Sequence, residues 1–407
     1  MKIKNLFLVF LYLLITLNML IQDAFLQSEL FFIISLFSLL IFFLINKSSL
    51  RSDLSKVYPL LFVAFIGLLF SSQNESSFII RDFYYYTNHI VIFLFGASMA
   101  KKISLNIFFR YYVMLSIFLL IIFLLKLIYL NISSYEYLSE FSYTAAYASL
   151  FPICFAIIFL SRHYKFQFLS PYYYYFLALI LLQIYFLDSR TSVVSTIVLV
   201  LVGLNTVNST SFKSITKNLL IFLTIFLLSY IIILFTNTPM VERFYSSFDE
   251  LNPFTAYNNL SDINRNWRGF EGYVSLLDFW NSGLINKIFG NGFGKEIYLG
   301  FEILLGESVH DKIYVFHNGY VNLLIKTGIL GLIIYLYYFI SNFFRYNKNL
   351  KTLNVELRLI RSLICGISIL ILFITFSVAG LMNLSIFPVM FTYGFLIKKE
   401  SILTNSF

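Results

Sequence analysis

Residues 319–343 read GYVNLLIKTGILGLIIYLYYFISNF, an apolar stretch with a single charged side chain, Lys326. About 20 such residues in a helix suffice to cross a lipid bilayer. Comparable stretches recur along the chain, which is 59% hydrophobic and 12% charged, whereas a soluble domain carries about 25% charged residues. The composition therefore predicts an all-α polytopic membrane protein and excludes a disordered or low-complexity chain.

Working outward from this stretch, we expect about 12 membrane spans. The predicted spans are residues 5–22, 30–46, 57–71, 83–100, 107–130, 143–161, 172–188, 191–207, 218–236, 319–343, 361–378 and 381–397. The first follows Lys2 and Lys4 and has no small-residue cleavage site, so we expect it to remain as a helix. Residues 1–407 then form a single integral membrane domain.

The basic residues predict the orientation of these spans. Lys and Arg are enriched in cytoplasmic loops, and most of those in this chain fall in alternate connections if both termini are cytoplasmic. The formal net charge of +9 is explained by this bias, so we expect no nucleic-acid partner. Three basic residues lie inside spans near their ends, where we expect them to snorkel to the interface: Arg110, Lys126 and Lys326.

One connection is long. Residues 237–317 separate spans nine and ten, and the orientation places them in the periplasm. Loops of this size usually carry function. Within the loop, Gly272 to Phe289 have apolar residues at helical spacing, which predicts either a helix on the membrane surface or one packed on the bundle. The run Gly290-Asn291-Gly292-Phe293-Gly294 allows tight turns, and a phosphate-binding role for it is the weaker interpretation because no strand precedes it.

Two polar sets at the outer face contain arginines. Asp188-Ser189-Arg190-Thr191 lies at a tight turn, where a helix start with an arginine beside it can bind an anion. An interfacial arginine with no ligand is an equal alternative. Arg265 and Arg268, with Glu271 nearby, share one face if the segment is helical, although a solvated set of charges explains them as well.

A third polar set is Phe316-His317-Asn318-Gly319-Tyr320, where the loop returns to the membrane. The positive end of a helix disfavours a charged imidazole, so His317 could act there as a base. A structural histidine is the alternative. No Cys, His or carboxylate spacing predicts a metal site, and Cys154 and Cys365 lie in apolar runs as small core residues.

These sets occur in a characteristic order. A helix begins at Ser189-Arg190-Thr191, a long outer loop holds Arg265, Arg268 and the glycine run 290–294, and His317-Asn318 precede an apolar helix containing Gly328-x-x-Gly331. Over residues 185–345 this order resembles the O-antigen polymerase and O-antigen ligase superfamily of bacterial envelope glycosyltransferases. One departure is that Trp267 lies between the two arginines, so either arginine can correspond to the family's residue.

The resemblance implies a GT-C-like fold in the bacterial inner membrane and a glycan donor carried on undecaprenyl diphosphate. It implies that His317 is the base or its positioner, and that Arg190 with Arg268 or Arg265 holds the diphosphate. Substrate contacts are expected from Asn318, Tyr320, Arg243, Gly292 and Gly294. No metal or other cofactor is implied, inversion at the anomeric carbon is expected, and a chain-length-regulating co-polymerase is the expected partner.

Three functions remain open. A polymerase that joins O-antigen repeat units is favoured, and a ligase that transfers the glycan to lipid A-core is the nearest alternative. A flippase for the same lipid-linked sugars belongs to another class. Transporters usually show internal repeats and mid-membrane polar residues, and few such residues are found in these spans.

Overall fold

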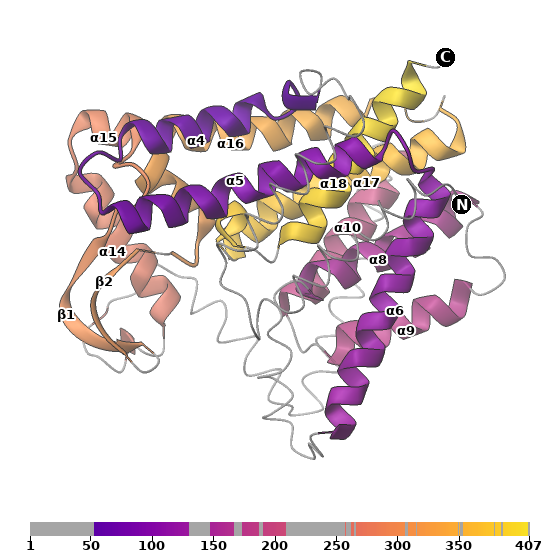
Figure 1. The fold of residues 1–407 in the computed structure, drawn as a ribbon, viewed down its shortest axis with the longest axis horizontal. Helices are drawn as coiled ribbons and strands as arrows, with labels where there is room; N and C mark the ends of the chain where they lie inside the picture. The colour runs from indigo at the N-terminus through magenta and orange to yellow at the C-terminus, as the bar shows by residue number, and fades with distance from the viewer. Residues whose placement is uncertain are drawn as a thin grey trace.

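The computed structural model describes residues 53–129, 147–166, 173–186, 190–208, 257, 262–263, 266–305, 308–314, 316–348, 350, 353–377, 379–383 and 386–405. The predicted spans 5–22, 30–46 and 218–236 lie outside the described residues, as do Arg243 and Arg265. The described part is mostly helical (Figure 1). This confirms the all-α class for that part, whereas the number of spans stays a prediction.

The described helices coincide with the other predicted spans, apart from shifted ends. The helices are α4 (Tyr58–Leu69), α5 (Ser76–Met99), α6 (Leu105–Tyr129), α8 (Tyr147–His163), α9 (Tyr173–Phe186), α10 (Arg190–Asn208), α14 (Trp267–Asn281), α15 (Leu284–Phe289), α16 (Gly319–Tyr346), α17 (Val355–Ser377) and α18 (Phe387–Thr404), with a 3₁₀ turn η2 (Gly380–Met382). Two of these, α16 and α17, are by length and composition capable of crossing a membrane. The start of α5 lies earlier than predicted, so it includes Arg81 and Asp82.

A two-stranded antiparallel hairpin in the long loop is an addition to the predicted architecture. It consists of β1 (Ile297–Leu305) and β2 (Ser308–Ile313). In β1 the side chains of Ile297, Leu299 and Ile303 are buried, whereas Tyr298 between them is exposed. This alternation with a period of two favours a strand with one covered face.

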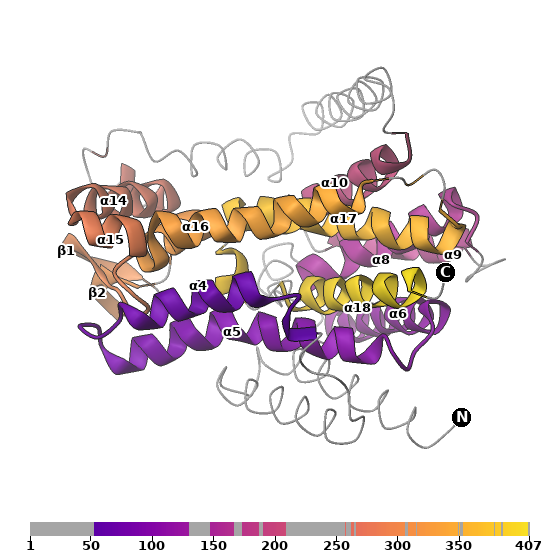
Figure 2. The same cartoon turned by 90° about the horizontal axis from the view of Figure 1, so that it is seen from above.

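Helices α4, α5 and α16 run along the long axis of the molecule (Figures 1 and 2), whereas α6 is steeply inclined to it in Figure 1. At one end lie α14, α15 and the hairpin, and we call this the hairpin end. At the opposite end Asp53 pairs with Lys101 and Lys398, and Arg361 pairs with Glu400. We call this the basic end, because the basic residues that the sequence assigns to the cytoplasm gather there.

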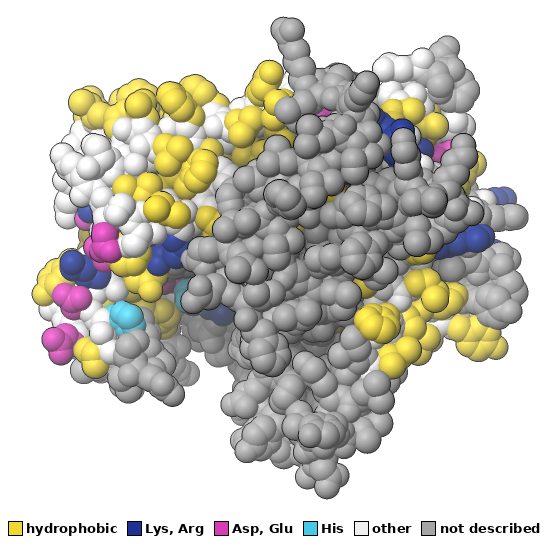
Figure 3. Space-filling view, viewed as in Figure 1, with side chains coloured by type: hydrophobic (Ala, Val, Ile, Leu, Met, Phe, Trp, Pro, Cys, Tyr) yellow, Lys and Arg dark blue, Asp and Glu magenta, His cyan; other side chains and the backbone are white. Residues whose placement is uncertain are grey.

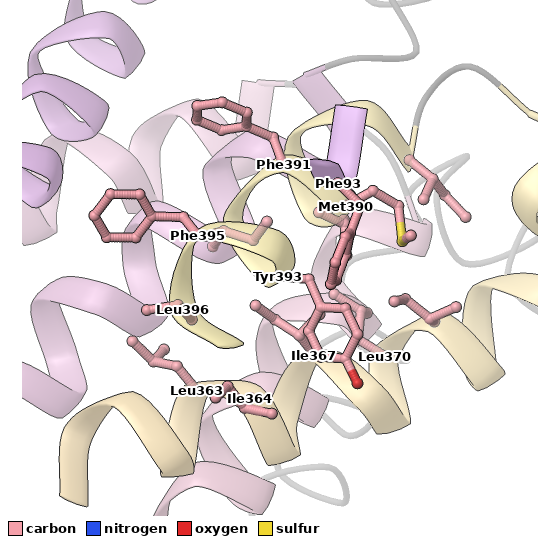
Figure 4. Packing of buried hydrophobic residues seen from close by; sticks show 14 of the residues in the cluster. Phe93, Leu363, Ile364, Ile367, Leu370, Met390, Phe391, Tyr393, Phe395 and Leu396 are labelled. Carbon is pink, nitrogen blue, oxygen red and sulfur yellow. The ribbon is translucent and has the colours of Figure 1, made fainter. Parts of the chain in front are cut away.

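Close contact between α5 and α18 forms the centre of the main hydrophobic core (Figure 4). A Cβ added to Gly96 would lie 2.1 Å from the Phe391 carbonyl oxygen, and one added to Gly394 would lie 2.0 Å from that of Phe93. Only glycine permits this approach of two helix backbones. Aromatic side chains fill the space on either side, and the thiols of Cys154 and Cys365 are buried and free, as predicted.

Helix α16 is broken at Gly328, where φ is 67° and ψ is −172°. The sequence predicts one continuous span here. The break is explained by contacts with the long loop. The backbone N–H groups of Asn291 and Gly292 donate to the carbonyls of Ile325 and Lys326 at 2.8 and 3.1 Å. Those carbonyls would otherwise accept bonds from the next helical turn. The loop therefore occupies the gap between the two halves of α16.

The glycine run 290–294 is held on its other side by α4 and the turn after it. The Phe293 N–H donates to the Gly67 carbonyl at 2.8 Å, and the Asn74 side-chain amide donates to the carbonyls of Asn291 and Phe293, both at 2.8 Å. The run thus links α4 to α16. Its amides are engaged within the protein, which favours a packing role over phosphate binding.

Replacing Gly292 with alanine is expected to destabilise the protein more than the same change at Gly300. Both have positive φ, of 81° and 83°, which costs an L-residue about 1–2 kcal/mol. At Gly292 the new Cβ would also lie 2.4 Å from the backbone carbon of Phe70, whereas nothing lies within 4 Å of it at Gly300. We expect about 1–3 kcal/mol more for that overlap. Thermal unfolding in detergent compares the two, and equal losses would contradict the packing role.

Candidate functional site

His317 lies at the hairpin end, immediately before the start of α16. Asn318 is the N-cap, and its side-chain oxygen accepts from the N–H groups of Tyr320 and Val321 at 3.0 and 3.3 Å. The prediction that His317 sits near the N-terminus of this helix is confirmed. Its side chain is 46% exposed, so the imidazole is accessible.

Glu271 on α14 holds this histidine in place. Its Oε2 accepts from the backbone N–H of His317 at 3.0 Å and lies 2.8 Å from the imidazole Nδ1. The Glu271 side chain is only 3% exposed. A carboxylate so placed favours the tautomer with the proton on Nδ1, which leaves Nε2 as the acceptor. The pair therefore has the arrangement of a general base with its orienting group.

A second hydrophobic cluster positions the pair. It joins Phe270 and Phe279 of α14 to the hairpin, to Phe316 and to the first turns of α16 through Val321 and Ile325. The predicted helix Gly272–Phe289 is in fact two, because Ser282 and Gly283 separate α14 from α15. Helix α14 packs on the bundle with Glu271 on its buried face, whereas Leu284, Ile285 and Ile288 of α15 are exposed.

Arg268 lies in the first turn of α14 with an exposed side chain. It precedes Glu271 by one helical turn, a spacing at which side chains are neighbours on the helix surface. The described helix begins at Trp267, so Arg268 lies one turn before Glu271 on the same helix, with its side chain exposed whereas that of Glu271 is buried.

Arg190 is the first residue of α10, as the sequence predicts. The structure does not describe its side chain. The contacts between α10 and α17 nevertheless show how far along the bundle this residue lies. Tyr164 bonds both Gly203 and Ser362, and Leu199 contacts Gly366, so α10 and α17 are antiparallel. Continuing this register brings Arg190 level with Thr375, whose carbonyl packs against Gly319. The starts of α10 and α16 therefore lie at the same end.

Several residues predicted to bind substrate make contacts within the protein that give each of them a structural role. Asn318 caps α16, and the Tyr320 hydroxyl donates to the Leu372 carbonyl at 2.6 Å. The Gly292 N–H donates to Lys326, and the Gly294 N–H donates to the Asp82 carboxylate at 2.7 Å. These contacts do not require a substrate, so their assignment to binding stays a prediction.

A buried charged group that the sequence pattern does not predict lies beside the site. Lys326 is fully buried and its ammonium lies 2.6 Å from the Asp82 carboxylate, so the expectation that it snorkels to the interface is wrong. Arg81, at 3.6 Å from the same carboxylate, completes the group. Lys326, an ionisable residue inside a predicted apolar helix, is the signal in the sequence, because such residues are costly and usually paired.

Comparison of the sequence with models of known families and with curated proteins gives no match. Within the described ranges, no three His, Cys, Asp or Glu side chains gather as ligands for a metal ion. The functional assignment therefore depends on the site geometry and on the sequence pattern.

Exchanging Glu271 for glutamine is expected to lower the reaction rate about 10- to 100-fold, the range found when a partner that orients a functional histidine is altered. The glutamine oxygen can still accept the His317 backbone N–H, but it gives less support to a charged imidazole. Asp278→Asn, on the same helix but in a partly exposed pair with Lys295, is the matched control. Initial rates of the glycan transfer that the sequence pattern leads us to expect measure the difference, and equal rates for the two variants would exclude an orienting role.

Proposed function

We propose that the chain is an integral membrane glycosyltransferase that joins lipid-diphosphate-linked oligosaccharide repeats, an O-antigen polymerase of the bacterial inner membrane. The observation that carries the proposal is the accessible His317 held by the buried Glu271 carboxylate, at the end of the bundle where α10 also begins. The order of sequence motifs supports the same reaction.

Exposed apolar stripes support the membrane location. On α16 the side chains of Ile329, Ile333, Tyr337, Ile340 and Phe344 are exposed, and their spacing puts them on one helix face. Tyr58, Phe62, Phe65 and Leu69 form a similar stripe on α4. Figure 3 shows hydrophobic side chains gathered over this side of the molecule, away from the charged groups of the hairpin. Patches of this extent are rare on soluble monomers.

The proposed reaction is direct displacement at the anomeric carbon. An acceptor hydroxyl oxygen attacks that carbon, its proton passes to Nε2 of His317, and the bond to the diphosphate oxygen breaks with its electron pair. The products are a glycoside of inverted configuration and a lipid diphosphate. Arginines near the leaving group, Arg268 and Arg190, stabilise its negative charge, so no acid is required to protonate it.

Lipopolysaccharide from a deletion strain carrying the chain on a plasmid tests the function. For a polymerase, we expect loss of the chain to leave core with a single repeat unit and no ladder, and the plasmid to restore the ladder. A ligase would instead be required for every attached repeat, including the first. A full ladder in the deletion strain would overturn both.

The purified protein provides a direct test. We expect it to extend lipid-linked repeats in the presence of EDTA, because the proposed chemistry uses protein groups alone. A reaction that stops in EDTA and resumes on adding a divalent cation would contradict the metal-independent mechanism while leaving the transfer activity in place.

A further inference from the structure

Arg81 is a largely buried arginine with unused hydrogen-bond donors. Its side chain is 17% exposed, and its guanidinium carbon lies 3.8 Å from the centre of the Tyr314 ring and 4.8 Å from that of Phe78. Its Nε and Nη2 atoms are buried and have no hydrogen-bond acceptor among the described residues. Stacking on rings fixes the orientation of the guanidinium plane, while donors without acceptors in a buried position are costly.

The charges around Arg81 do not balance. Asp82 is the shared anion, and its Oδ2 already accepts from Lys326 at 2.6 Å and from the Gly294 N–H at 2.7 Å. Arg81 approaches the other oxygen only to 3.6 Å, beyond a good hydrogen bond. Among the residues that the structure describes, two cations thus share one carboxylate, which leaves one positive charge without a counter-charge in this largely buried group.

The surroundings connect this charge to the candidate site. Lys326 donates to the Tyr314 carbonyl at 2.9 Å, and its ammonium lies 5.7 Å from the centre of the Phe316 ring. Tyr314 and Phe316 belong to the segment that leads into His317. One turn before Lys326 on α16, Asn322 is 1% exposed, and neither polar atom of its side chain has a hydrogen-bond partner within the described ranges. A second unpaired polar group beside the cations indicates that a polar ligand belongs here.

We propose that Arg81, with Lys326 behind it, binds a phosphoryl group at the hairpin end. A phosphoryl group supplies the acceptor oxygens that Nε and Nη2 lack, and its negative charge offsets the excess positive charge. The group can come from the diphosphate of the proposed substrate, which rests on the proposed function, or from the headgroup of an ordinary phospholipid. The chemistry recognised is the same in both cases.

Calorimetric titration with inorganic pyrophosphate tests this site on the full-length protein in maltoside detergent micelles, which contain no phosphoryl group. We expect Arg81→Gln to weaken binding about 10- to 100-fold, the range for one lost hydrogen bond to a charged group, and Arg81→Lys to weaken it less. The control Lys295→Gln removes a partly exposed cation of the same end and should bind as the unaltered protein does. No binding by the unaltered protein, or equal binding by Arg81→Gln, would overturn the proposal.

Nanodiscs that contain phosphatidylglycerol distinguish the two sources. If this lipid weakens pyrophosphate binding to the unaltered protein as strongly as Arg81→Gln does, a lipid headgroup occupies the site. If phosphatidylglycerol leaves pyrophosphate binding unchanged, the site binds a diphosphate and not a lipid headgroup. Phenylglyoxal labelling of the unaltered protein gives an independent measurement should a variant fail to fold. We expect pyrophosphate to protect Arg81 from modification, and an unprotected Arg81 would refute its involvement.

These measurements are separate from turnover. A protein that binds pyrophosphate through Arg81 but never extends repeats would keep the phosphoryl site and overturn the glycosyltransferase proposal. The reverse result would overturn the phosphoryl site alone.

Discussion

Replacing His317 with alanine is expected to lower the rate of chain extension about 10²- to 10⁴-fold, the usual contribution of a general base. Without the imidazole, the acceptor hydroxyl would have to lose its proton to water. Glu271 cannot substitute, because its carboxylate is buried behind the histidine. Extension of lipid-linked repeats by purified protein, followed by the product ladder against time, measures the effect.

A matched control is His310→Ala, a change of the same type in β2 of the hairpin. His310 is not paired with Glu271, so we expect the rate to stay within a few-fold of the unaltered protein. A folded His317→Ala protein that extends chains at the normal rate would exclude His317 as the base and remove the main support for the mechanism.

Asp82→Asn is expected to cause the largest loss of stability, about 3–5 kcal/mol, the range for breaking a buried ion pair. The change leaves Arg81 and Lys326 facing each other with no anion between them. It also weakens the acceptor of the Gly294 N–H, which anchors the glycine run. The midpoint of thermal unfolding in detergent, compared with that of the unaltered protein, measures the loss.

Two further variants separate charge from packing. Lys326→Met should cost less than Asp82→Asn, because Arg81 remains 3.6 Å from the carboxylate to balance it. Lys295→Met breaks a partly exposed pair at 3.7 Å, so we expect at most about 1 kcal/mol. If Lys326→Met proves more harmful than Asp82→Asn, the excess positive charge inferred around Arg81 is absent.

The sequence predicted the helices of the described part and the positions at which α10 and α16 begin. Long apolar runs and a capping residue such as Asn318 are local signals. The helix that each of them predicts can therefore be identified from that segment of the sequence alone. The class of the fold and the place of His317 before a helix both follow from such signals.

The pairing partners were not predictable in this way. The sequence places Glu271 beside the arginines, but its bond to His317 depends on how α14 packs on the hairpin and α16. The pair of Asp82 and Lys326 joins two helices that are far apart in the chain. A single sequence does not show that these two helices are neighbours in space. The break at Gly328 was hidden for the same reason, because its cause is the loop at residues 290–294.

The glycine run between the halves of α16 limits how freely the long loop can be exchanged between related proteins. A loop transplanted alone would bring its own backbone to a gap shaped by Gly67, Asn74 and Gly328 of the recipient. Transfer of the proposed sugar specificity should therefore succeed more often when residues 67–82 and 316–331 are exchanged together with the loop. For protein engineering, the segment to transfer is therefore the loop together with the two helix segments that it contacts, and not the loop alone.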